Sequence, residues 1–257
     1  MTQQNMAQQN MTEENTVQQN TIQQNTQAKP ADSTQPTQPT DPADPAGRAN
    51  PTILSLLADW ANLCTIAGVV SGLLGIYFAA QGRLQLSAAM GVIAVILDCF
   101  DGPIARSTKN RPAYMSSLGL QLDSLADAVC SGVGPAVLVL AVGNWNSFLL
   151  IPAALIVVAG VTRLAYFNVY GLAGGKFSGM PIFYNPVVVA LVLLVLWALA
   201  PDAAIGGAAA AGFAVAILNV APFTVPKLRG RYLKGFLVLC FALTAVLFGY
   251  AAQGIGS

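Results

Sequence analysis

Apolar residues dominate the chain from Ile53 onward, in long runs separated by short breaks of glycine, proline, asparagine or charged residues. A run of about 20 apolar residues is long enough to cross a bilayer as an α-helix. We therefore expect seven membrane-spanning helices, at approximately residues 62–80, 86–105, 117–142, 148–170, 182–200, 203–221 and 233–252. The fold class predicted by this pattern is an all-α polytopic membrane protein.

Residues 1–50 differ from the rest of the chain in composition. The triplet QQN recurs there at a five-residue spacing, and a stretch rich in proline and threonine follows it. Such a segment has too few aliphatic side chains to offset the entropy of ordering itself. We expect a disordered polar tail at residues 1–50, a juxtamembrane interfacial helix at 51–61, a transmembrane domain at 62–232 and an additional C-terminal transmembrane helix at 233–257.

The composition agrees with a membrane protein and restricts the available chemistry. Hydrophobic residues make up 55% of the chain and charged residues 9%, whereas about a quarter of the residues of a typical soluble protein are charged. Histidine is absent, which excludes imidazole acid/base catalysis and imidazole metal ligands. The four cysteines form no C-x-x-C pair, so neither a zinc site nor a disulfide framework is expected. Catalytic or metal-binding work would fall to aspartate.

The distribution of basic residues predicts the orientation of the helices. Lysine and arginine in short loops favour the cytoplasmic side of a membrane. With the tail in the cytoplasm, the opposite side receives only Arg83. The cytoplasmic loops then contain Arg106, Lys109, Arg111, Lys176, Lys227, Arg229, Arg231 and Lys234. We therefore expect a protein of the cell membrane with its N-terminus on the cytoplasmic side.

Four aspartates, Asp98, Asp101, Asp123 and Asp127, lie within segments that are otherwise apolar. Ionised carboxylates inside a bilayer are costly, so they usually face a partner, a cavity or a functional site. Residues three or four apart share one face of a helix, so each pair would point in one direction. If the second and third spans pack antiparallel, the four carboxylates converge near the cytoplasmic side. Their mutual repulsion then calls for cations, and Mg²⁺ or Mn²⁺ suits carboxylate oxygens best.

The neighbours of the aspartates extend this interpretation. Gly102 and Ala105 leave space for a ligand, and Arg106 adds positive charge for a phosphate, so the stretch predicts a pyrophosphate site. An ion or proton transporter is an alternative use of intramembrane carboxylates. A transporter predicts ionisable residues strung across the bilayer, whereas these gather near one side. A purely structural scaffold would give no reason for four converging carboxylates.

The complete string is Asp98-x-x-Asp101-Gly102-x-x-Ala105-Arg106, then twelve residues, then Gly119-x-x-x-Asp123-x-x-x-Asp127. It resembles the signature of the CDP-alcohol phosphatidyltransferases. The resemblance covers about residues 58–227 and includes the stretch WANLCTIAG, which is similar to the family's opening motif. It implies a six-helix core, to which the C-terminal helix is an addition. It also implies transfer of a phosphatidyl group from a CDP-lipid such as CDP-diacylglycerol to a hydroxyl, with release of CMP.

The resemblance also implies roles for single residues and partners. Asp98, Asp101 and Asp123 would be metal ligands, and Asp127 would help to bind a second ion and act as the base toward the acceptor hydroxyl. The cytidine and phosphate side would be lined by Gly102, Ala105, Arg106 and Gly119. Two divalent ions, Mg²⁺ or Mn²⁺, are expected in each site, and a homodimer in membrane lipid. No nucleic acid is expected as a partner.

Three further stretches concern the acceptor: SLADAVCSGVGPA from Ser124, RLAYFNV from Arg163 and FSGMPI from Phe177. Together they resemble the serine-transferring branch of the family, although Ser131 and Tyr166 depart from its pattern. L-serine is the expected acceptor, and inositol phosphate, glycerol phosphate and choline are the alternatives. Arg163 would bind the acceptor carboxylate or a substrate phosphate. As an alternative, it would be an arginine at a helix end that reaches lipid phosphates.

Overall fold

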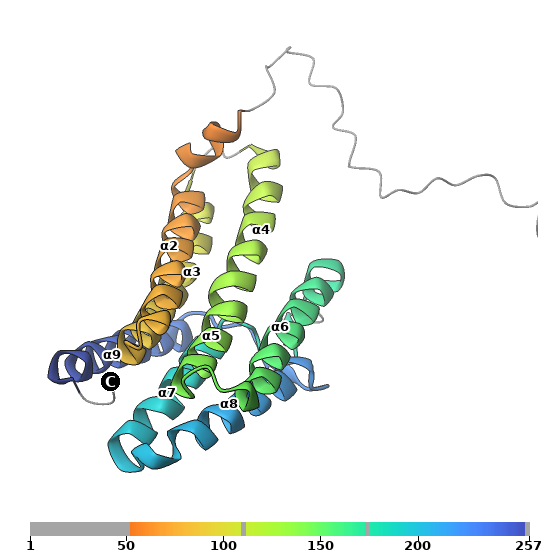
Figure 1. The fold of residues 1–257 in the computed structure, drawn as a ribbon. Helices are drawn as coiled ribbons and strands as arrows, with labels where there is room; N and C mark the ends of the chain where they lie inside the picture. The colour runs from red at the N-terminus through yellow and green to blue at the C-terminus, as the bar shows by residue number, and fades with distance from the viewer. Residues whose placement is uncertain (1–51, 109–111, 173–174, 255–257) are drawn as a thin grey trace, which may run out of the picture. The chain divides into compact units, whose positions relative to one another are not determined.

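The structure is a computed structural model that describes residues 52–108, 112–172 and 175–254 (Figure 1). The predicted tail at residues 1–50 lies outside the described residues, as do Lys109 and Arg111. The α-helices are α2 (Trp60–Ala80), α3 (Leu84–Ser107), α4 (Ala113–Asp127), α5 (Gly134–Val142), α6 (Leu150–Tyr170), α7 (Tyr184–Leu199), α8 (Ala204–Val220) and α9 (Arg231–Gln253). Shorter elements are 3-10 helices at Ile53–Ala58, Ser147–Leu149 and Pro201–Ala203, and a π-helical segment at Ala128–Val133 that joins α4 to α5.

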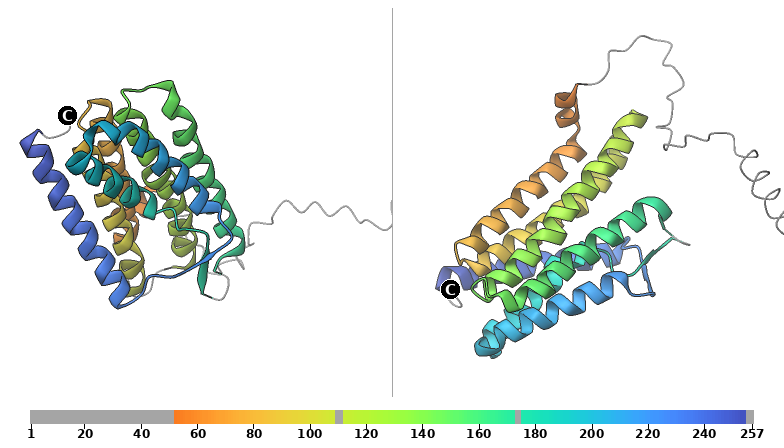
Figure 2. Two further views of the ribbon diagram at one scale, coloured as in Figure 1. Left: turned by 90° about the horizontal axis from the view of Figure 1, so that it is seen from below. Right: turned by 45° about the vertical axis from the view of Figure 1, so that its right-hand side comes forward.

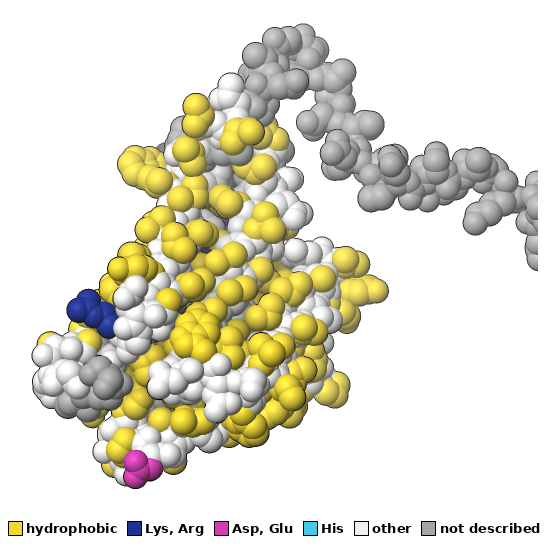
Figure 3. All heavy atoms as spheres, in the orientation of Figure 1, with side chains coloured by type: hydrophobic (Ala, Val, Ile, Leu, Met, Phe, Trp, Pro, Cys, Tyr) yellow, Lys and Arg dark blue, Asp and Glu magenta, His cyan; other side chains and the backbone are white. Residues whose placement is uncertain are grey.

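Six helical segments of the described chain are long and apolar enough to cross a membrane, so the protein is an integral membrane protein of the all-α class. They are Trp60–Ala80, Leu84–Ser107, Tyr114–Val142, Ser147–Tyr170, Pro201–Val220 and Arg231–Gln253. A helix satisfies every backbone polar group internally, which lipid requires. Hydrophobic side chains cover most of the face in Figure 3, where charged groups are scarce.

The predicted span at 182–200 differs from the other six. It is helical as expected, but α7 has only 16 residues, which corresponds to about 24 Å of helix. A hydrocarbon core of about 30 Å is thicker than this. The predicted count of seven full spans is therefore not met by length. Within the predicted interfacial segment 51–61, Ile53–Ala58 form a 3-10 helix in which Ile53 and Leu54 are exposed, and α2 begins at Trp60. The interfacial position of this segment stays a prediction.

The helices pack around a core shared by α3, α5, α6, α7, α8 and α9. Its fully buried members include Val92, Val139, Ile156, Val189 and Leu193. The strongest helix pairing is α2 with α3, followed by α6 with α8 and α3 with α9. In the two views of Figure 2, α4 and α5 run on as one rod between the α2–α3 pair and α6. This arrangement places the end of α3 beside α4.

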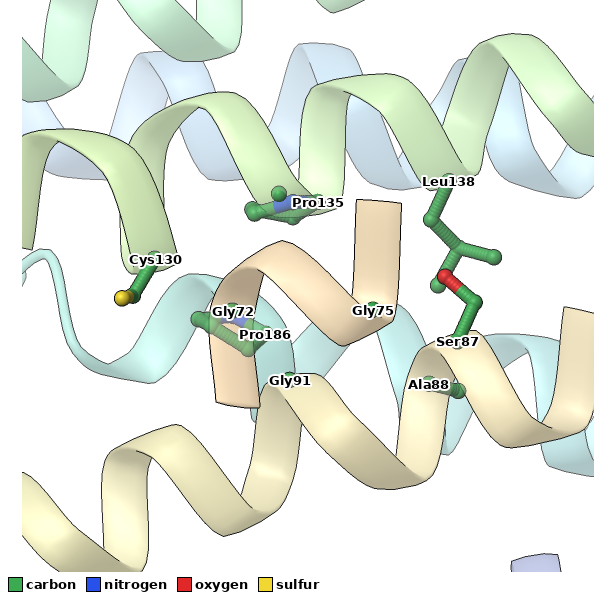
Figure 4. A pocket seen from close by; sticks show the side chains of 10 residues that line it. Gly72, Gly75, Ser87, Ala88, Gly91, Cys130, Pro135, Leu138 and Pro186 are labelled. Atoms are coloured by element: carbon green, nitrogen blue, oxygen red, sulfur yellow. The ribbon is translucent and has the colours of Figure 1, made fainter. Parts of the chain in front are cut away.

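Small residues allow α2 to approach its neighbours closely. A Cβ atom on Gly72 would lie 2.7 Å from the Sγ atom of Cys130, and one on Gly75 would lie 3.2 Å from the carbonyl oxygen of Ser87. Figure 4 shows these residues around a small gap between α2, α3 and the π-helical segment. Close backbone approach through small residues is typical of membrane helices. It explains how α2, α3 and the π-helical segment approach one another closely.

A short β-ribbon adds to the helices and was not expected from the apolar pattern. Strand β1 (Lys176–Ser178) pairs antiparallel with β2 (Thr224–Pro226), and Phe177 lies opposite Val225. The ribbon links the segment after α6 to the segment after α8. It thereby brings Phe177 and Lys227, which are far apart in the sequence, to the same cavity.

Candidate active site

The carboxylates of Asp98, Asp101 and Asp123 form a tight cluster between α3 and α4. Each offers one oxygen atom, and these oxygens all lie within 4.8 Å of one another. Asp98 and Asp101 lie in the C-terminal part of α3, and Asp123 lies in the last part of α4. The three side chains are partly buried. The structure thus brings together carboxylates from two helices, as the three-residue and four-residue spacings predict.

Asp127 lies at the end of α4, outside the three-carboxylate cluster but on the same cavity. Directly after it the helix continues for one π-helical segment, Ala128–Val133. The hydroxyl of Ser131 donates a hydrogen bond of 3.4 Å to Oδ1 of Asp127. The carbonyl of Ser131 in turn accepts a hydrogen bond of 3.1 Å from Nδ2 of Asn185 on α7. Since π-helical turns are frequent at functional sites, this local irregularity marks Asp127 as a specially placed residue.

Thr65 on α2 fixes the carboxylate of Asp101. Its hydroxyl lies 2.8 Å from Oδ2 of Asp101, to which it donates a hydrogen bond. Nearby, Sγ of Cys64 donates to the carbonyl oxygen of Leu97 over 3.3 Å. These contacts tie α2 to the acidic part of α3. Because Thr65 holds Oδ2 of Asp101, it restrains the orientation of this carboxylate.

An open cavity, here called the aspartate cavity, contains all four carboxylates. Its empty volume is about 1070 Å³, part of which is open to solvent. Three cations also line it: Arg106, Arg163 and Lys227. Lys227 lines this cavity together with Asp123. The cavity therefore combines a compact anionic cluster with separate cationic groups, an arrangement that suits a ligand carrying both metal-bound and free anionic oxygens.

A second opening, here called the glycine cavity, adjoins the first. It has an empty volume of about 480 Å³ and shares Asp101, Gly102, Leu120 and Asp123 with the aspartate cavity. The small residues of the motif line it: Gly102, Ala105 and Gly119. Asn62 and Thr65 of α2 complete the wall. The glycine cavity therefore has little side-chain bulk beside two of the clustered carboxylates.

The two arginines of the predicted site lie in different surroundings. A Cβ atom on Gly102 would lie 3.4 Å from Nη1 of Arg106, so this guanidinium folds back over the glycine. Arg163 is only 7% exposed and lies over the rings of Phe167 and Phe177, at 5.4 and 5.1 Å from the ring centroids. An arginine that reaches lipid phosphates would extend to the interface. The burial of Arg163 disagrees with that alternative and agrees with a role inside the cavity.

The donor set fits a hard divalent cation. Three carboxylate oxygens within 4.8 Å of one another supply the oxygen ligands that Mg²⁺ and related ions prefer. No histidine occurs in the chain and no cysteine belongs to the cluster, so a softer metal would find poorer ligands. The carboxylates are gathered at one place instead of being distributed along the helices, which disagrees with a proton or ion relay.

Sequence reasoning missed four residues of the site: Thr65, Ser131, Asn185 and Lys227. Thr65 lies in the stretch WANLCTIAG, which carried part of the family resemblance, so a signal for it existed. Ser131 was noted only as a departure from the family pattern. Asn185 lies in α7 and Lys227 directly follows β2, and no local pattern in the sequence connects either position to the aspartates.

Comparison with known proteins agrees with this geometry. The family model described as CDP-alcohol phosphatidyltransferase matches residues 58–225. This match covers more than half of the chain and includes the aspartates, Arg163 and both strands up to Val225. The protein belongs to the CDP-alcohol phosphatidyltransferase family.

Several individual relatives also match the chain. The chain is 34% identical over 137 residues to the CDP-diacylglycerol–serine O-phosphatidyltransferase of Helicobacter pylori (strain J99), which covers 52% of this chain and 56% of the relative. It is 32% identical over 122 residues to the archaetidylserine synthase of Methanothermobacter thermautotrophicus, covering 47% and 52%. The Bacillus subtilis CDP-diacylglycerol–serine O-phosphatidyltransferase is 31% identical over 143 residues, covering 50% and 78%. The chain thus spans about half the length of the first two relatives.

Proposed function

We propose that this protein transfers the phosphatidyl group of CDP-diacylglycerol to the hydroxyl of L-serine, forming phosphatidylserine and releasing CMP. The observation that carries the proposal is the cluster of three carboxylate oxygens within 4.8 Å of one another, on the cavity that also contains Asp127 and Arg163. The names of the H. pylori and B. subtilis relatives support serine as the acceptor.

Asp98, Asp101 and Asp123 would hold the divalent cation, and Asp127 would contribute to a second one. Mg²⁺ and Mn²⁺ both suit this oxygen donor set. When bound, such ions polarise the phosphoryl oxygens and stabilise the negative charge on the departing CMP. Thr65 keeps Asp101 oriented through its hydrogen bond of 2.8 Å, so α2 takes part in shaping the ligand set.

The glycine cavity would receive the cytidine end of the donor. Gly102, Ala105 and Gly119 provide room for a planar base and its ribose next to the shared carboxylates. Arg106 and Lys227 line the adjoining aspartate cavity, where their positive charges would bind phosphate oxygens. The lipid-bearing phosphate would then lie beside Asp127.

Asp127 would act as the base toward serine. As the serine oxygen bonds to the phosphorus that carries diacylglycerol, Asp127 accepts the hydroxyl proton. The bond from that phosphorus to the bridging oxygen breaks, and the oxygen leaves with CMP. A positioned general base of this kind contributes about 10²- to 10⁴-fold to a rate. Arg163, buried against Phe167 and Phe177 on the same cavity, would hold the serine carboxylate.

We place the site on the cytoplasmic side of the cell membrane, in a homodimer. Arg106 lies at the end of α3, Lys176 in β1 and Lys227 directly after β2. These cations support the proposed orientation, because basic residues near the ends of membrane spans favour the cytoplasmic side. Water-soluble serine and CMP would enter and leave from that side. The homodimer follows from the family resemblance.

The proposal is tested by acceptor-dependent CMP release. Purified protein in detergent is incubated with CDP-diacylglycerol, Mn²⁺ or Mg²⁺, and in turn L-serine, inositol phosphate, glycerol phosphate or choline. We expect serine to support the fastest release and Asp98→Asn to abolish it. Faster release with another acceptor would refute serine transfer but leave the chemistry standing. CMP release that is independent of every acceptor would refute phosphatidyl transfer.

A further inference from the structure

A third cavity adjoins the aspartate cavity at Arg163. It is formed between the C-terminal end of α6, strand β1 and the C-terminal end of α8, and its empty volume is about 620 Å³. Its polar lining consists of Thr162, Arg163, Tyr166, Ser178, Gly179 and Asn219. We call it the α6–α8 cavity. Arg163 lines both this cavity and the aspartate cavity, so the two cavities adjoin at this residue.

Two buried polar side chains in its wall lack partners. Asn219 is 1% exposed, and neither its Oδ1 nor its Nδ2 atom has a hydrogen-bond partner within the described part of the chain. In the same part of the chain, Nε and Nη2 of Arg163 are also buried without a partner. Native proteins rarely leave such groups unsatisfied, and each instance calls for an explanation. A polar ligand would provide the missing hydrogen bonds.

The wall around Asn219 is fixed by the backbone. The Gly179 amide donates a hydrogen bond to the Phe223 carbonyl, and the Met180 amide donates one to the Leu218 carbonyl, each over 2.8 Å. Gly179 has a φ of +67°, and a Cβ atom there would collide with the carbonyl oxygen of Asn219. Only glycine allows this contact. The end of β1 is thereby held against the end of α8, and the cavity is a built feature of the fold.

The polar side chains that line the α6–α8 cavity indicate which chemical groups a bound ligand would carry. A guanidinium is a forked donor that matches a carboxylate. The Asn219 amide offers an acceptor oxygen for an ammonium group and a donor nitrogen for a second oxygen. Thr162, Tyr166 and Ser178 add hydroxyls, and none of the described residues that line the cavity is acidic. A small molecule with both a carboxylate and an ammonium group would satisfy these groups, whereas choline would leave Arg163 without an anionic partner.

We infer that the α6–α8 cavity binds the amino-acid acceptor by its carboxylate and ammonium groups, and that Asn219 is a residue that selects an amino acid over other alcohols. This inference rests on the proposed transfer to serine. Arg163 holds the carboxylate where the two cavities adjoin, so the hydroxyl of the bound amino acid extends into the aspartate cavity toward Asp127. Asn219 acts on acceptor recognition and takes no part in binding the CDP-lipid.

The first test replaces the amide by an apolar side chain of similar size. Asn219→Leu is expected to raise the KM for serine about 10- to 100-fold, the range for hydrogen bonds to a charged group. The KM for CDP-diacylglycerol should stay within about twofold. Thermal stability should be unchanged or higher, because the amide that is removed has no partner. Asn219→Thr replaces the amide by a hydroxyl that can still form a hydrogen bond, so it should give an intermediate KM for serine. A purely structural role would instead lower the melting temperature and leave the KM for serine unchanged.

The second test uses the wild-type protein and does not depend on any variant folding. L-Alanine keeps both charged groups of serine but lacks the hydroxyl, so it should inhibit competitively against serine. Ethanolamine lacks the carboxylate and 3-hydroxypropionate lacks the ammonium group, and each should compete at least about tenfold more weakly, because each loses a charged hydrogen bond. Equal competition by all three would overturn the inference.

The outcomes separate this inference from the proposed function. If the wild type transfers to serine but Asn219→Leu has the same KM for serine, the inference fails and the proposed function stands. If the wild type uses no amino acid as acceptor, both fail. Serine transfer with a raised KM in Asn219→Leu and selective competition by alanine supports both.

Discussion

Nδ2 of Asn185 donates a hydrogen bond of 3.1 Å to the backbone carbonyl of Ser131, and this contact joins the start of α7 to the π-helical segment that follows Asp127. The Ser131 hydroxyl lies 3.4 Å from Oδ1 of Asp127. Asn185 is fully buried. The placement of the proposed base therefore depends on a residue from a distant part of the sequence.

Replacement of Asn185 tests this dependence. Asn185→Leu removes the donor and leaves the buried Ser131 carbonyl without its partner, which costs about 1–3 kcal/mol of stability. We expect kcat to fall as well, because Asp127 loses a fixed position, while the KM for CDP-diacylglycerol changes little. Thermal unfolding and steady-state kinetics measure the two effects.

Thr244→Val is the matched control for Asn185→Leu. Thr244 is also buried, but its hydroxyl donates to the Cys240 carbonyl within α9, over 2.8 Å. Its loss should leave kcat unchanged. A folded Asn185→Leu protein with wild-type kcat would show that the Ser131 contact does not position Asp127.

Replacement of Thr65 tests whether a residue of α2 helps to position the metal ligand Asp101. Thr65→Val keeps the shape of the side chain but removes the hydrogen bond to Asp101. Loss of a group that orients a metal ligand typically weakens metal binding about 10- to 100-fold. We expect the Mn²⁺ concentration for half-maximal activity to rise by that factor. Thr65→Ser keeps the hydroxyl and should restore affinity; if both variants bind Mn²⁺ like the wild type, Thr65 does not orient Asp101.

Removal of divalent cations should abolish activity. Protein treated with EDTA is expected to stop releasing CMP and to recover when Mn²⁺ or Mg²⁺ is added. Asp98→Asn and Asp123→Asn should stay inactive after the addition, because each loses a charged ligand. Electron paramagnetic resonance measures directly how much of the added Mn²⁺ binds to the protein. Asp202→Asn, which changes an exposed carboxylate outside the cluster, should bind Mn²⁺ and turn over normally. Full turnover in EDTA would contradict a metal-dependent site.

Asp127→Asn separates chemistry from binding. The amide keeps the size of the side chain but cannot accept the proton, so turnover should drop by about 10²- to 10⁴-fold. Calorimetry in detergent should show that CDP-diacylglycerol binding weakens much less than in Asp98→Asn. Raising serine should not rescue Asp127→Asn, whereas it should recover part of the rate of Arg163→Ala. Normal turnover of Asp127→Asn would exclude Asp127 as the base.

The sequence was sufficient for the helical class and for the convergence of the acidic residues. The three- and four-residue spacings place carboxylates on single helix faces, and antiparallel packing of the second and third spans was the further condition that predicted their convergence. The structure brings Asp98, Asp101 and Asp123 together. The length of α7 was overestimated because the apolar run from Ile182 includes residues that lie in turns.

Other parts of the site depend on tertiary packing that no local pattern encodes. The ribbon that carries Phe177 to the cavity pairs two three-residue strands far apart in the sequence. The π-helical segment after Asp127 reads as continuous apolar helix, and Asn185 meets it only because α7 packs against it. The unpartnered amide of Asn219 becomes visible only once its surroundings are known.

The most direct measurement of the central claim follows the oxygen atom of the acceptor. Purified protein is given CDP-diacylglycerol, Mn²⁺ and L-serine labelled with ¹⁸O in its hydroxyl group, and both products are analysed by mass spectrometry. Displacement at phosphorus by the serine oxygen predicts that every phosphatidylserine molecule formed from labelled serine keeps the ¹⁸O and that CMP contains none. Label in CMP, or phosphatidylserine without label, would contradict phosphatidyl transfer to the serine hydroxyl.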